Sequence, residues 1–452
     1  MKQRDYQVFI FAGIVLLYVV GQFVIGTWNP DDGRFHFDAP ADADFLYYAA
    51  ITNSVPDNFP PHNPAFAGVK LTQPYLQYYP AALLAKIINP YNAMRLLNVL
   101  YLVLFGLLLR RYFPGRYGFP LLILFTASTF GVAINAAGVD FIARGFTHVP
   151  FFLLLTVALY EKSLKWRLPA LVGAAFVNGY LMLMVIPFLC IIAILEKKKE
   201  LYYLLATGVL ATALSALFIS SEVTARPWHF IITESFYFDP IEIIKHAVPF
   251  IILSVLYRER RMAVLLVIAG VFGIFIHYNP FFPVFVIYFA GALMLAGGEV
   301  RIPKSKLPAG VIAVILFVGF VISAYQKYNP DAGDYYARYD DRIQGAVGWL
   351  VENTESSAVI AALTADERDL ALIMEKRPVY LGYIGHLGHL GLDWKPRYEN
   401  TFRLFSSGIA PPEVDYIFYG PVERRYFPNA ILPFDTVYSD KAVVLYQVSA
   451  KR

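Results

Sequence analysis

The sequence predicts an α-helical polytopic membrane protein with about eleven transmembrane helices, followed by a C-terminal soluble α/β domain. Of the 452 residues, 58% are hydrophobic and 16% are charged, whereas a soluble domain carries about 25% charged residues. Apolar runs of membrane length alternate with short basic segments. Such runs stop after residue 325, which divides the chain into a membrane domain (1–325) and a C-terminal domain (326–452).

Each long apolar run defines an expected span. The runs lie at 6–27, 95–109, 119–136, 148–161, 168–179, 181–195, 201–220, 240–257, 262–277, 280–297 and 307–325. The first run follows Lys2 and Arg4, and no small-residue cleavage site comes after it, so we expect an uncleaved span. The single cysteine, Cys190, lies inside a run and is expected to be a small buried apolar residue, which excludes an intrachain disulfide and a zinc cluster of several thiols.

Two segments are ambiguous, and the positive-inside rule decides both. Residues 75–88 are apolar but short, and a helix that lies at the outer face keeps the basic cluster 110–116 inside. Residues 168–195 could form one tilted helix, but two short helices broken around Asn178 return the lysines 197–199 to the inside. Each half is then too short to cross a bilayer of about 30 Å alone, so the hairpin needs a protein or water-lined surrounding.

With these choices every basic cluster lies on the cytoplasmic side. The clusters are Lys2/Arg4, Arg110/Arg111/Arg116, Lys162/Lys165/Arg167, Lys197–Lys199, Arg258/Arg260/Arg261 and Arg301/Lys304/Lys306. The opposite side carries only scattered basic residues before the C-terminal domain. We therefore expect an integral, multi-pass membrane protein whose N-terminus is cytoplasmic, and whose first loop (28–94) and C-terminal domain are extracytoplasmic.

The first loop holds two closely spaced carboxylates in the sequence ADADFLYY (41–48). Asp42 and Asp44 stand beside a membrane span, where an acid is costly unless water, a metal or another cation compensates it, so they predict a functional site. An Asp-x-Asp pair can also hold a divalent cation through oxygen ligands, which leaves a metal site open as an alternative to a catalytic base. Tyr48 and the nearby tyrosines suit an interfacial belt or stacking against carbohydrate or lipid.

Two later loops carry polar residues, and both loops are expected on the outer face of the membrane, like the first loop. These residues are Asp140, Arg144, His148, Arg226 and His229. The first three are four residues apart and share one helical face, either as a helix-end ion pair or as the polar wall of the cavity that Asp44 faces. The last two lie in the loop 221–240 and either anchor the chain at the interface or bind a lipid phosphate, to which arginine offers paired donors.

The C-terminal region alternates expected helices and strands, which is typical of an α/β domain. Helices are expected at 341–352, 365–376 and 396–405, and strands at 358–363, 378–383, 416–419 and 442–448. Acidic residues outnumber basic ones there, which argues against a nucleic-acid partner. His386 and His389 lie in the glycine-rich GYIGHLGHLGL without a third ligand, so we expect a structural or substrate-adjacent loop.

This order of features resembles the GT-C superfamily of membrane glycosyltransferases, which includes the protein O-mannosyltransferases and the aminoarabinose transferase of lipid A. The first-loop motif DxDF…YY with NFPPHNPAFAG…YLQYYPAALLAK, and the C-terminal VDYIFYGPVERRYF…KAVVLYQV, carry the resemblance. It implies a GT-C-like fold. It also implies the transfer, with inversion, of a sugar from a polyprenyl-phosphate carrier to a lipid, glycan or protein acceptor outside a prokaryotic plasma membrane.

The resemblance also assigns roles to residues of this chain. The family's first-loop acid falls on Asp44 or Asp42, with Asp44 as the expected general base, and its second-loop acid falls on Asp140. Many members have an Asp-Glu pair where this chain has Asp42-Ala43-Asp44, so the choice between the two aspartates, and a metal role for both, stay open. The residues expected to hold the substrate or its phosphate are Arg144, His148, Arg226, His229, His62 and Tyr48.

A transporter or flippase for a lipid or small solute is the competing class. Broken helices near the midplane suit transporters as well. Transporters, however, favour ionisable residues inside their spans and often contain internal repeats. In this chain the expected spans are nearly free of Asp and Glu, the acids gather in outer loops, and no repeat is detectable. This placement favours an enzyme.

Overall fold

The chain is described by a computed structural model. The described residues are 3–23, 28–29, 34–35, 43–55, 59, 61–71, 75–118, 121, 145–220, 260–275, 281–297, 341–363, 373, 376–382, 384, 387 and 392–448. The chain folds into two compact units. The helical unit comprises Met1–His36, Met94–Phe218 and Ile231–Gly333. The loop–tail unit comprises Phe37–Ala93, Ile219–Phe230 and Asp334–Arg452.

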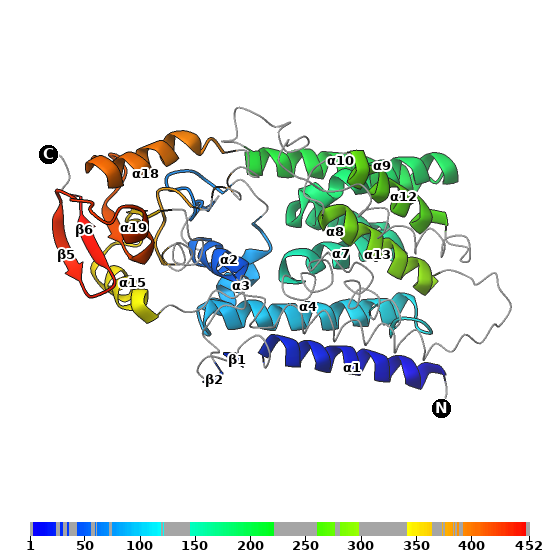
Figure 1. Cartoon of the computed structure of the whole chain (residues 1–452). Helices are drawn as coiled ribbons and strands as arrows, with labels where there is room; N and C mark the ends of the chain where they lie inside the picture. Colours follow the sequence, from blue (N-terminus) through cyan, green and yellow to red (C-terminus); the bar gives the residue numbers. More distant parts are fainter. Residues whose placement is uncertain are drawn as a thin grey trace. The chain divides into compact units, whose positions relative to one another are not determined.

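Long apolar helices build the helical unit (Figure 1). They are α1 (Gln3–Phe23), α4 (Pro90–Tyr112), α7 (Gly145–Tyr160), α8 (Leu164–Val177), α9 (Gly179–Glu196), α10 (Lys199–Ser220), α12 (Arg260–Phe275) and α13 (Phe281–Gly297). The short strands β1 (Trp28–Asn29) and β2 (Arg34–Phe35) pair in antiparallel fashion after α1. Among the described residues, three segments are long and apolar enough to cross a membrane: Pro90–Tyr112, Gly179–Glu196 and Lys199–Leu217.

Aromatic rings from several helices meet in the core of the helical unit. The ring centroid of Phe289 (α13) lies 6.4 Å from that of Phe105 (α4) and 4.6 Å from that of Phe152 (α7). All three rings are fully buried. Lipid tails are as apolar as these side chains, so close packing rather than exclusion from water stabilises such contacts between membrane helices.

The described helices agree with most of the expected spans. Three expected runs lie wholly or largely outside the described residues: 119–136, 240–257 and 307–325. The ambiguous segment 168–195 is broken at Asn178, as expected, and the Asn178 side chain caps α9 by accepting a hydrogen bond from the Leu181 N–H (3.2 Å). The expectation that both halves are too short to span is wrong for α9, because Gly179–Glu196 is long and apolar enough to cross a membrane.

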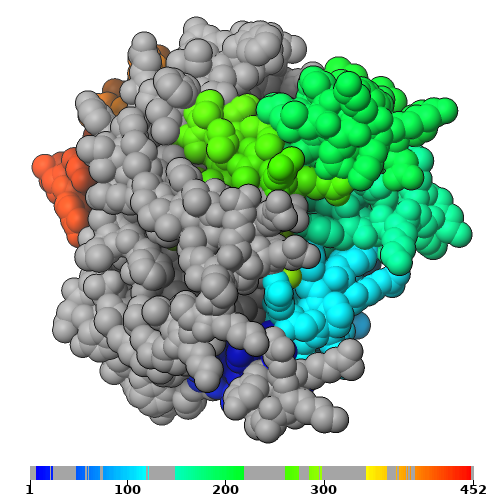
Figure 2. All heavy atoms as spheres, turned by 90° about the vertical axis from the view of Figure 1, so that its right-hand side faces the viewer, coloured from blue at the N-terminus to red at the C-terminus, as the bar shows by residue number. Residues whose placement is uncertain are grey.

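Figure 2 shows atoms of α4 (cyan) beside those of the α7–α10 region (green). Basic residues that are far apart in the sequence meet acidic ones at one end of the helical unit. There Arg111, near the end of α4, forms an ion pair with Glu161, just after α7 (2.9 Å). The Lys162 N–H and the Tyr112 hydroxyl also donate to the Glu161 carboxylate. These hydrogen bonds, together with the charge of Arg111, lower the pKa of Glu161 and keep it ionised.

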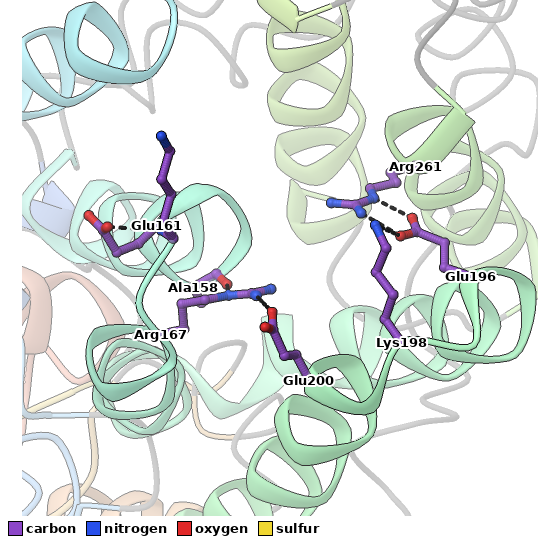
Figure 3. Close-up of polar contacts among 8 residues, drawn as sticks. Ala158, Glu161, Arg167, Glu196, Lys198, Glu200 and Arg261 are labelled. Atoms are coloured by element: carbon purple, nitrogen blue, oxygen red, sulfur yellow. Dashed lines mark hydrogen bonds and ion pairs between the residues drawn. The ribbon is translucent and has the colours of Figure 1, made fainter.

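Two further ion pairs join the helices at the same end (Figure 3). Arg167 near the start of α8 binds Glu200 near the start of α10 (2.9 Å). Glu196 at the end of α9 accepts hydrogen bonds from Arg261 near the start of α12, and Lys198 lies 3.0 Å from the same carboxylate. The α8–α9 hairpin therefore returns the chain to the end from which it started.

The loop–tail unit combines two first-loop helices with the C-terminal elements (Figure 1). The helices are α2 (Ala43–Ser54), α3 (Tyr78–Ala85), α15 (Asp341–Asn353), α18 (Lys395–Ser407) and α19 (Pro421–Tyr426). The sheet has the order β3 (Ile360–Ala361), β4 (Tyr416–Tyr419), β6 (Val444–Gln447), β5 (Asp435–Ser439). β3 and β4 are parallel, and the other neighbours are antiparallel. With eight residues, α3 is too short to cross a membrane, in agreement with the expectation for 75–88.

The C-terminal expectations agree with the structure in large part. The helices expected at 341–352 and 396–405 correspond to α15 and α18, and the last two expected strands correspond to β4 and β6. The strand expected at 378–383 is wrong, because its described residues, 378–382, form only one bridge, Val379 with Ile360. Sequence reasoning missed α19 and β5. Most of the helix expected at 365–376 and both histidines of the glycine-rich segment lie outside the described residues.

Candidate functional site

Helix α2 carries the first-loop acid. Asp44 is its second residue, whereas Asp42 precedes the helix and lies outside the described residues. A helix dipole favours the ionised form of an acidic residue in the first turn. Farther along, Ala49, Ala50 and Ile51 are buried, which fixes the helix within the loop–tail unit. The helix therefore supplies a rigid support for the aspartate at its start.

Tyrosine rings pack together where α2 contacts α3. The centroid of the Tyr48 ring lies 5.9 Å from that of Tyr78 and 6.3 Å from that of Tyr47. Tyr47 and Tyr78 are buried, and this burial raises the pKa of both hydroxyls, with a further rise for Tyr78 from the neighbouring Tyr47. Both tyrosines therefore stay protonated and hold α2 against α3 rather than act as bases.

A turn of the first loop, Asn63–Gly68, docks against the extended segment 379–382 of the C-terminal region. The backbone hydrogen bonds are Val379 N–H to the Pro64 carbonyl (3.0 Å), Ala67 N–H to the Val379 carbonyl (3.0 Å) and Gly382 N–H to the Ala65 carbonyl (2.6 Å). Segments that are far apart in the sequence thus satisfy one another's backbone groups. The first loop and the C-terminal region form one structural unit for this reason.

Arg397 of α18 clamps the same junction. Its guanidinium carbon lies 3.9 Å from the centroid of the Phe66 ring and 4.8 Å from that of Tyr380. Its nitrogens donate to the Ala67 carbonyl (2.8 Å) and the Tyr380 carbonyl (2.6 Å). Burial lowers the pKa of Arg397, while Tyr380 and Glu413 act in the opposite direction. Sequence reasoning missed this residue, because nothing in the sequence links α18 to the first loop.

A cavity of about 600 Å³ lies beside the docked turn, within the loop–tail unit. The end of α2, the turn itself and the C-terminal region all line it. Its polar lining residues include Asn53, His62, Asn63, Ser357 and Lys376. This size falls in the range of about 300–1,000 Å³ that small-molecule sites occupy. Of the residues expected to bind substrate, His62 is placed here, exposed at the cavity wall.

Two polar side chains are buried in the helical unit, in the early turns of α4. Arg95 and Asn98 are completely buried, and the Asn98 side chain donates to the Gln22 side-chain oxygen of α1 (3.1 Å). An ionisable residue inside an apolar helix is by default a functional hypothesis. In the sequence, Arg95 is visible only as a lone arginine near the start of an apolar run.

Several expected site residues lie outside the described part of the chain. They are Asp42, Asp140, Arg144, Arg226 and His229. His148 lies in α7, half-buried, with its ring centroid 4.8 Å from that of Phe285. Of the expected residues, only Tyr48 and His62 have described side chains within the loop–tail unit.

A metal site is not assigned by the described residues. Among them, no three histidine, cysteine or acidic side chains lie close enough to share an ion. The carboxylates that sequence reasoning considered as ligands are those of Asp42 and Asp44, whose side chains are not among those described. The choice between a metal pair and a single base is therefore a question for experiment.

No protein-family model matches the chain, and no curated protein matches it in sequence. Solved structures do match. The crystal structure of ArnT from Cupriavidus metallidurans bound to undecaprenyl phosphate superposes with a TM-score of 0.55 at 12% identity, covering 98% of each chain. The apo structure of the same protein gives a TM-score of 0.53 at 13% identity, again covering 98% of each chain. The chain thus has an ArnT-like membrane fold over nearly its whole length, which confirms the resemblance noted in the sequence.

Proposed function

We propose that this chain is a membrane glycosyltransferase. It takes a sugar from a polyprenyl-phosphate carrier and passes it, with inversion, to an acceptor at the outer face of a prokaryotic plasma membrane. The observation that carries the proposal is the full-length match in fold to ArnT, which has been solved with undecaprenyl phosphate bound. The isoprenoid tail of such a carrier stays in the membrane, so a fold with apolar helices beside polar loops suits it.

The placement of acidic residues supports an enzyme over a transporter. In the described membrane helices, the acids Asp5, Glu196 and Glu200 stand only in terminal turns. Glu196 and Glu200 belong to the ion pairs with Arg261 and Arg167. Transport pathways place ionisable residues near the middle of the membrane instead. The buried Arg95 is the described residue closest to that pattern, and it stands near the start of α4.

Asp44 is assigned the role of general base. It accepts the proton of an acceptor hydroxyl as that oxygen attacks the anomeric carbon of the sugar from the side opposite the phosphate. The bond between the anomeric carbon and the phosphate oxygen breaks, and its electron pair leaves with the polyprenyl phosphate. A positioned base contributes about 10²–10⁴-fold to the rate. The place of Asp44 in the first turn of α2 supports the ionised form that a base requires.

Basic side chains are assigned to the departing phosphate, where negative charge grows in the transition state. They are Arg144, His148, Arg226 and His229, to which we add the buried Arg95. Arginine is suited to this task because its planar fork binds two phosphate oxygens at once. Asp140 is retained as the second acid of the site, and Tyr48 and His62 as residues that contact substrate. Orientation follows the positive-inside rule, which puts the first loop outside.

The test is the transfer of labelled sugar from a panel of polyprenyl-phosphate sugars into membrane fractions. We expect Asp44→Asn to reduce transfer by about 10²–10⁴-fold while the variant elutes as the wild type does on size exclusion. Asp42→Asn is the matched control and should retain most of the activity. The opposite result would move the base to Asp42. No transfer by the wild type from any donor would favour a transporter.

The same assay decides between a base and a metal pair. Transfer that survives extensive treatment with EDTA supports Asp44 acting alone. Transfer that is lost with EDTA and restored by Mg²⁺ or Mn²⁺ supports a cation held by Asp42 and Asp44, because both ions prefer carboxylate oxygens. In that case both Asp→Asn variants should lose activity together.

A further inference from the structure

An open groove of about 430 Å³ lies in the helical unit between α4, α7 and the start of α8. The proposed reaction does not use it. Most of its wall is apolar and is formed by Leu108, Leu154, Val157, Pro169 and Ala170. Lipid chains are as apolar as these side chains, so a groove of this kind on membrane helices suits an acyl chain.

The apolar surface continues from the groove along the outside of α4. Leu100, Leu104 and Leu107 are exposed, and their spacing of three or four residues places them on one face of the helix with Arg111. Apolar side chains that a membrane helix exposes contact lipid chains. The stripe of leucines therefore gives a chain a path that ends at the guanidinium of Arg111, which lines the groove.

The mouth of the groove has the features of a membrane interface. Trp166, near the start of α8, lines the groove and is 59% exposed, and tryptophan is enriched where lipid headgroups meet the hydrocarbon. The Lys165 amine lies 5.7 Å from the centroid of the Trp166 ring. A cation and an interfacial ring thus stand side by side where the headgroup of a lipid in the groove would lie.

The charge at this mouth indicates which headgroup fits. In the described segments 110–112 and 160–166, the exposed cations Arg110, Arg111, Lys162 and Lys165 accompany one carboxylate, that of Glu161. This carboxylate already accepts hydrogen bonds from Arg111, from the Tyr112 hydroxyl and from the Lys162 N–H. Arg111 contacts it through Nη2, and a guanidinium has donors on two further nitrogens. The surplus of positive charge favours an anionic headgroup.

We propose that this groove binds one anionic phospholipid of the membrane. Lys165 and Arg111 bind its phosphate, Trp166 packs at the level of its headgroup, and one acyl chain lies against the apolar wall. The site is separate from the proposed reaction, because Arg111 lies sixteen residues beyond Arg95 on α4, about 24 Å along the helix. The positive-inside rule predicts that the lipid belongs to the cytoplasmic leaflet.

Trp166 itself reports on the site. The purified full-length protein is reconstituted into phosphatidylcholine vesicles that contain the same minor fraction of either brominated phosphatidylglycerol or brominated phosphatidylcholine. Bromine quenches a tryptophan only at close range, and the difference between the wild type and Trp166→Phe isolates the signal of Trp166. We expect the quenching of Trp166 to show a preference of about fivefold or more for the anionic lipid. Equal quenching by the two lipids would overturn the proposal.

A matched pair of lysines tests whether the preference belongs to the groove. Lys165 and Lys199 are both exposed, and each amine lies 5.7 Å from the centroid of an aromatic ring, Trp166 and Tyr203 respectively. Neither Lys199 nor Tyr203 lines the groove. Lys165→Gln should lower the preference about fivefold, whereas Lys199→Gln should leave it unchanged. An equal loss in both variants, or no loss in either, would contradict a site at the groove.

Competition identifies the lipid class. In vesicles with brominated phosphatidylglycerol, equal small amounts of unbrominated phosphatidylglycerol or of undecaprenyl phosphate are added, and the recovery of Trp166 fluorescence is measured. Recovery that is at least as large with phosphatidylglycerol supports a phospholipid site. Larger recovery with undecaprenyl phosphate would assign the groove to a polyprenyl carrier and overturn the proposal.

Discussion

Arg397 shows how one side chain can connect segments that the sequence keeps far apart. It lies against two aromatic rings and donates to two backbone carbonyls, one in the first loop and one in the C-terminal region. A guanidinium suits this site because its planar face stacks on rings while its edge donates in fixed directions. A lysine would keep the charge but lose the stacking and one of the directed hydrogen bonds.

We therefore expect Arg397→Lys to destabilise the loop–tail unit by about 1–3 kcal/mol. Thermal unfolding of the purified protein, followed together with limited proteolysis of the first loop, measures the effect. Arg403→Lys is the matched control, because Arg403 stands exposed on the same helix. Equal melting temperatures and equal cleavage for the two variants would show that the contacts of Arg397 do not stabilise the loop–tail unit.

For single residues, the sequence pointed to the acids of the first loop, whose role stays a prediction, but it predicted neither helix α2 nor the arginine that contacts the turn of that loop. Asp44 was recognisable because a carboxylate beside a membrane span is costly unless another group compensates its charge. Arg397 was not, because its role depends on contacts with the first loop, which is far away in the sequence. Asn63 was not either, because only the structure shows that it is buried. An asparagine before a proline reads as an ordinary turn residue until its burial is known.

Among the elements, the docking of the turn Asn63–Gly68 on the segment 379–382 depends on a close approach of two backbones. A Cβ atom on Gly382 would lie 2.6 Å from the Ala65 Cβ and 2.8 Å from its carbonyl oxygen. Neither atom can move without moving the turn. Glycine is thus required at position 382 because a side chain would not fit there, and not because of the backbone conformation.

We expect Gly382→Ala to destabilise the junction by about 1–3 kcal/mol, as overpacking typically does. Gly348→Ala in α15 is the matched control, because a Cβ atom at Gly348 would meet no described atom within 4 Å, and alanine favours a helix over glycine. The melting temperature should fall in the first variant and stay level or rise in the second. A Gly382→Ala protein as stable as the wild type would show that the turn docks more loosely than its hydrogen bonds indicate.

The elements that were predicted from the sequence are those whose side chains form an apolar run or a periodic apolar pattern. β4 is buried along three of its four residues and was predicted with its observed bounds. β5 was missed because its residues DTVYS are exposed or half-exposed at the edge of the sheet and so show no apolar run. The strand expected at 378–383 is apolar enough, but most of its backbone bonds go to the first loop, which no local pattern reveals.

For the whole molecule, the positive-inside rule made one prediction that the fold supports strongly. It required the segment 168–195 to turn back, and the structure breaks the helix at Asn178. As a result, Arg111, Arg167 and Arg261 come together with their acidic partners at one end of the helical unit. Arginines and glutamates spread over some 150 residues of sequence would not pair in this way if the turn were absent.

The remaining question of orientation can be decided by cysteine labelling, since the chain has one cysteine, Cys190, which can be replaced by alanine. In that background, Lys162→Cys, Lys198→Cys and Glu399→Cys each place a thiol at an exposed position. We expect a membrane-impermeant maleimide to label only the Glu399→Cys variant in intact cells, and to label the other two after lysis, because the positive-inside rule predicts that the basic end faces the cytoplasm.

Each alternative arrangement gives a distinct labelling pattern. A single crossing through 168–195 would put Lys162 and Lys198 on opposite sides, so only one of the two variants would be labelled in intact cells. An inverted protein would label both of them and leave Glu399→Cys unlabelled. That second result would place Asp44 in the cytoplasm, where the proposed transfer at the outer face could not occur. The labelling pattern therefore tests the proposed reaction as well as the fold.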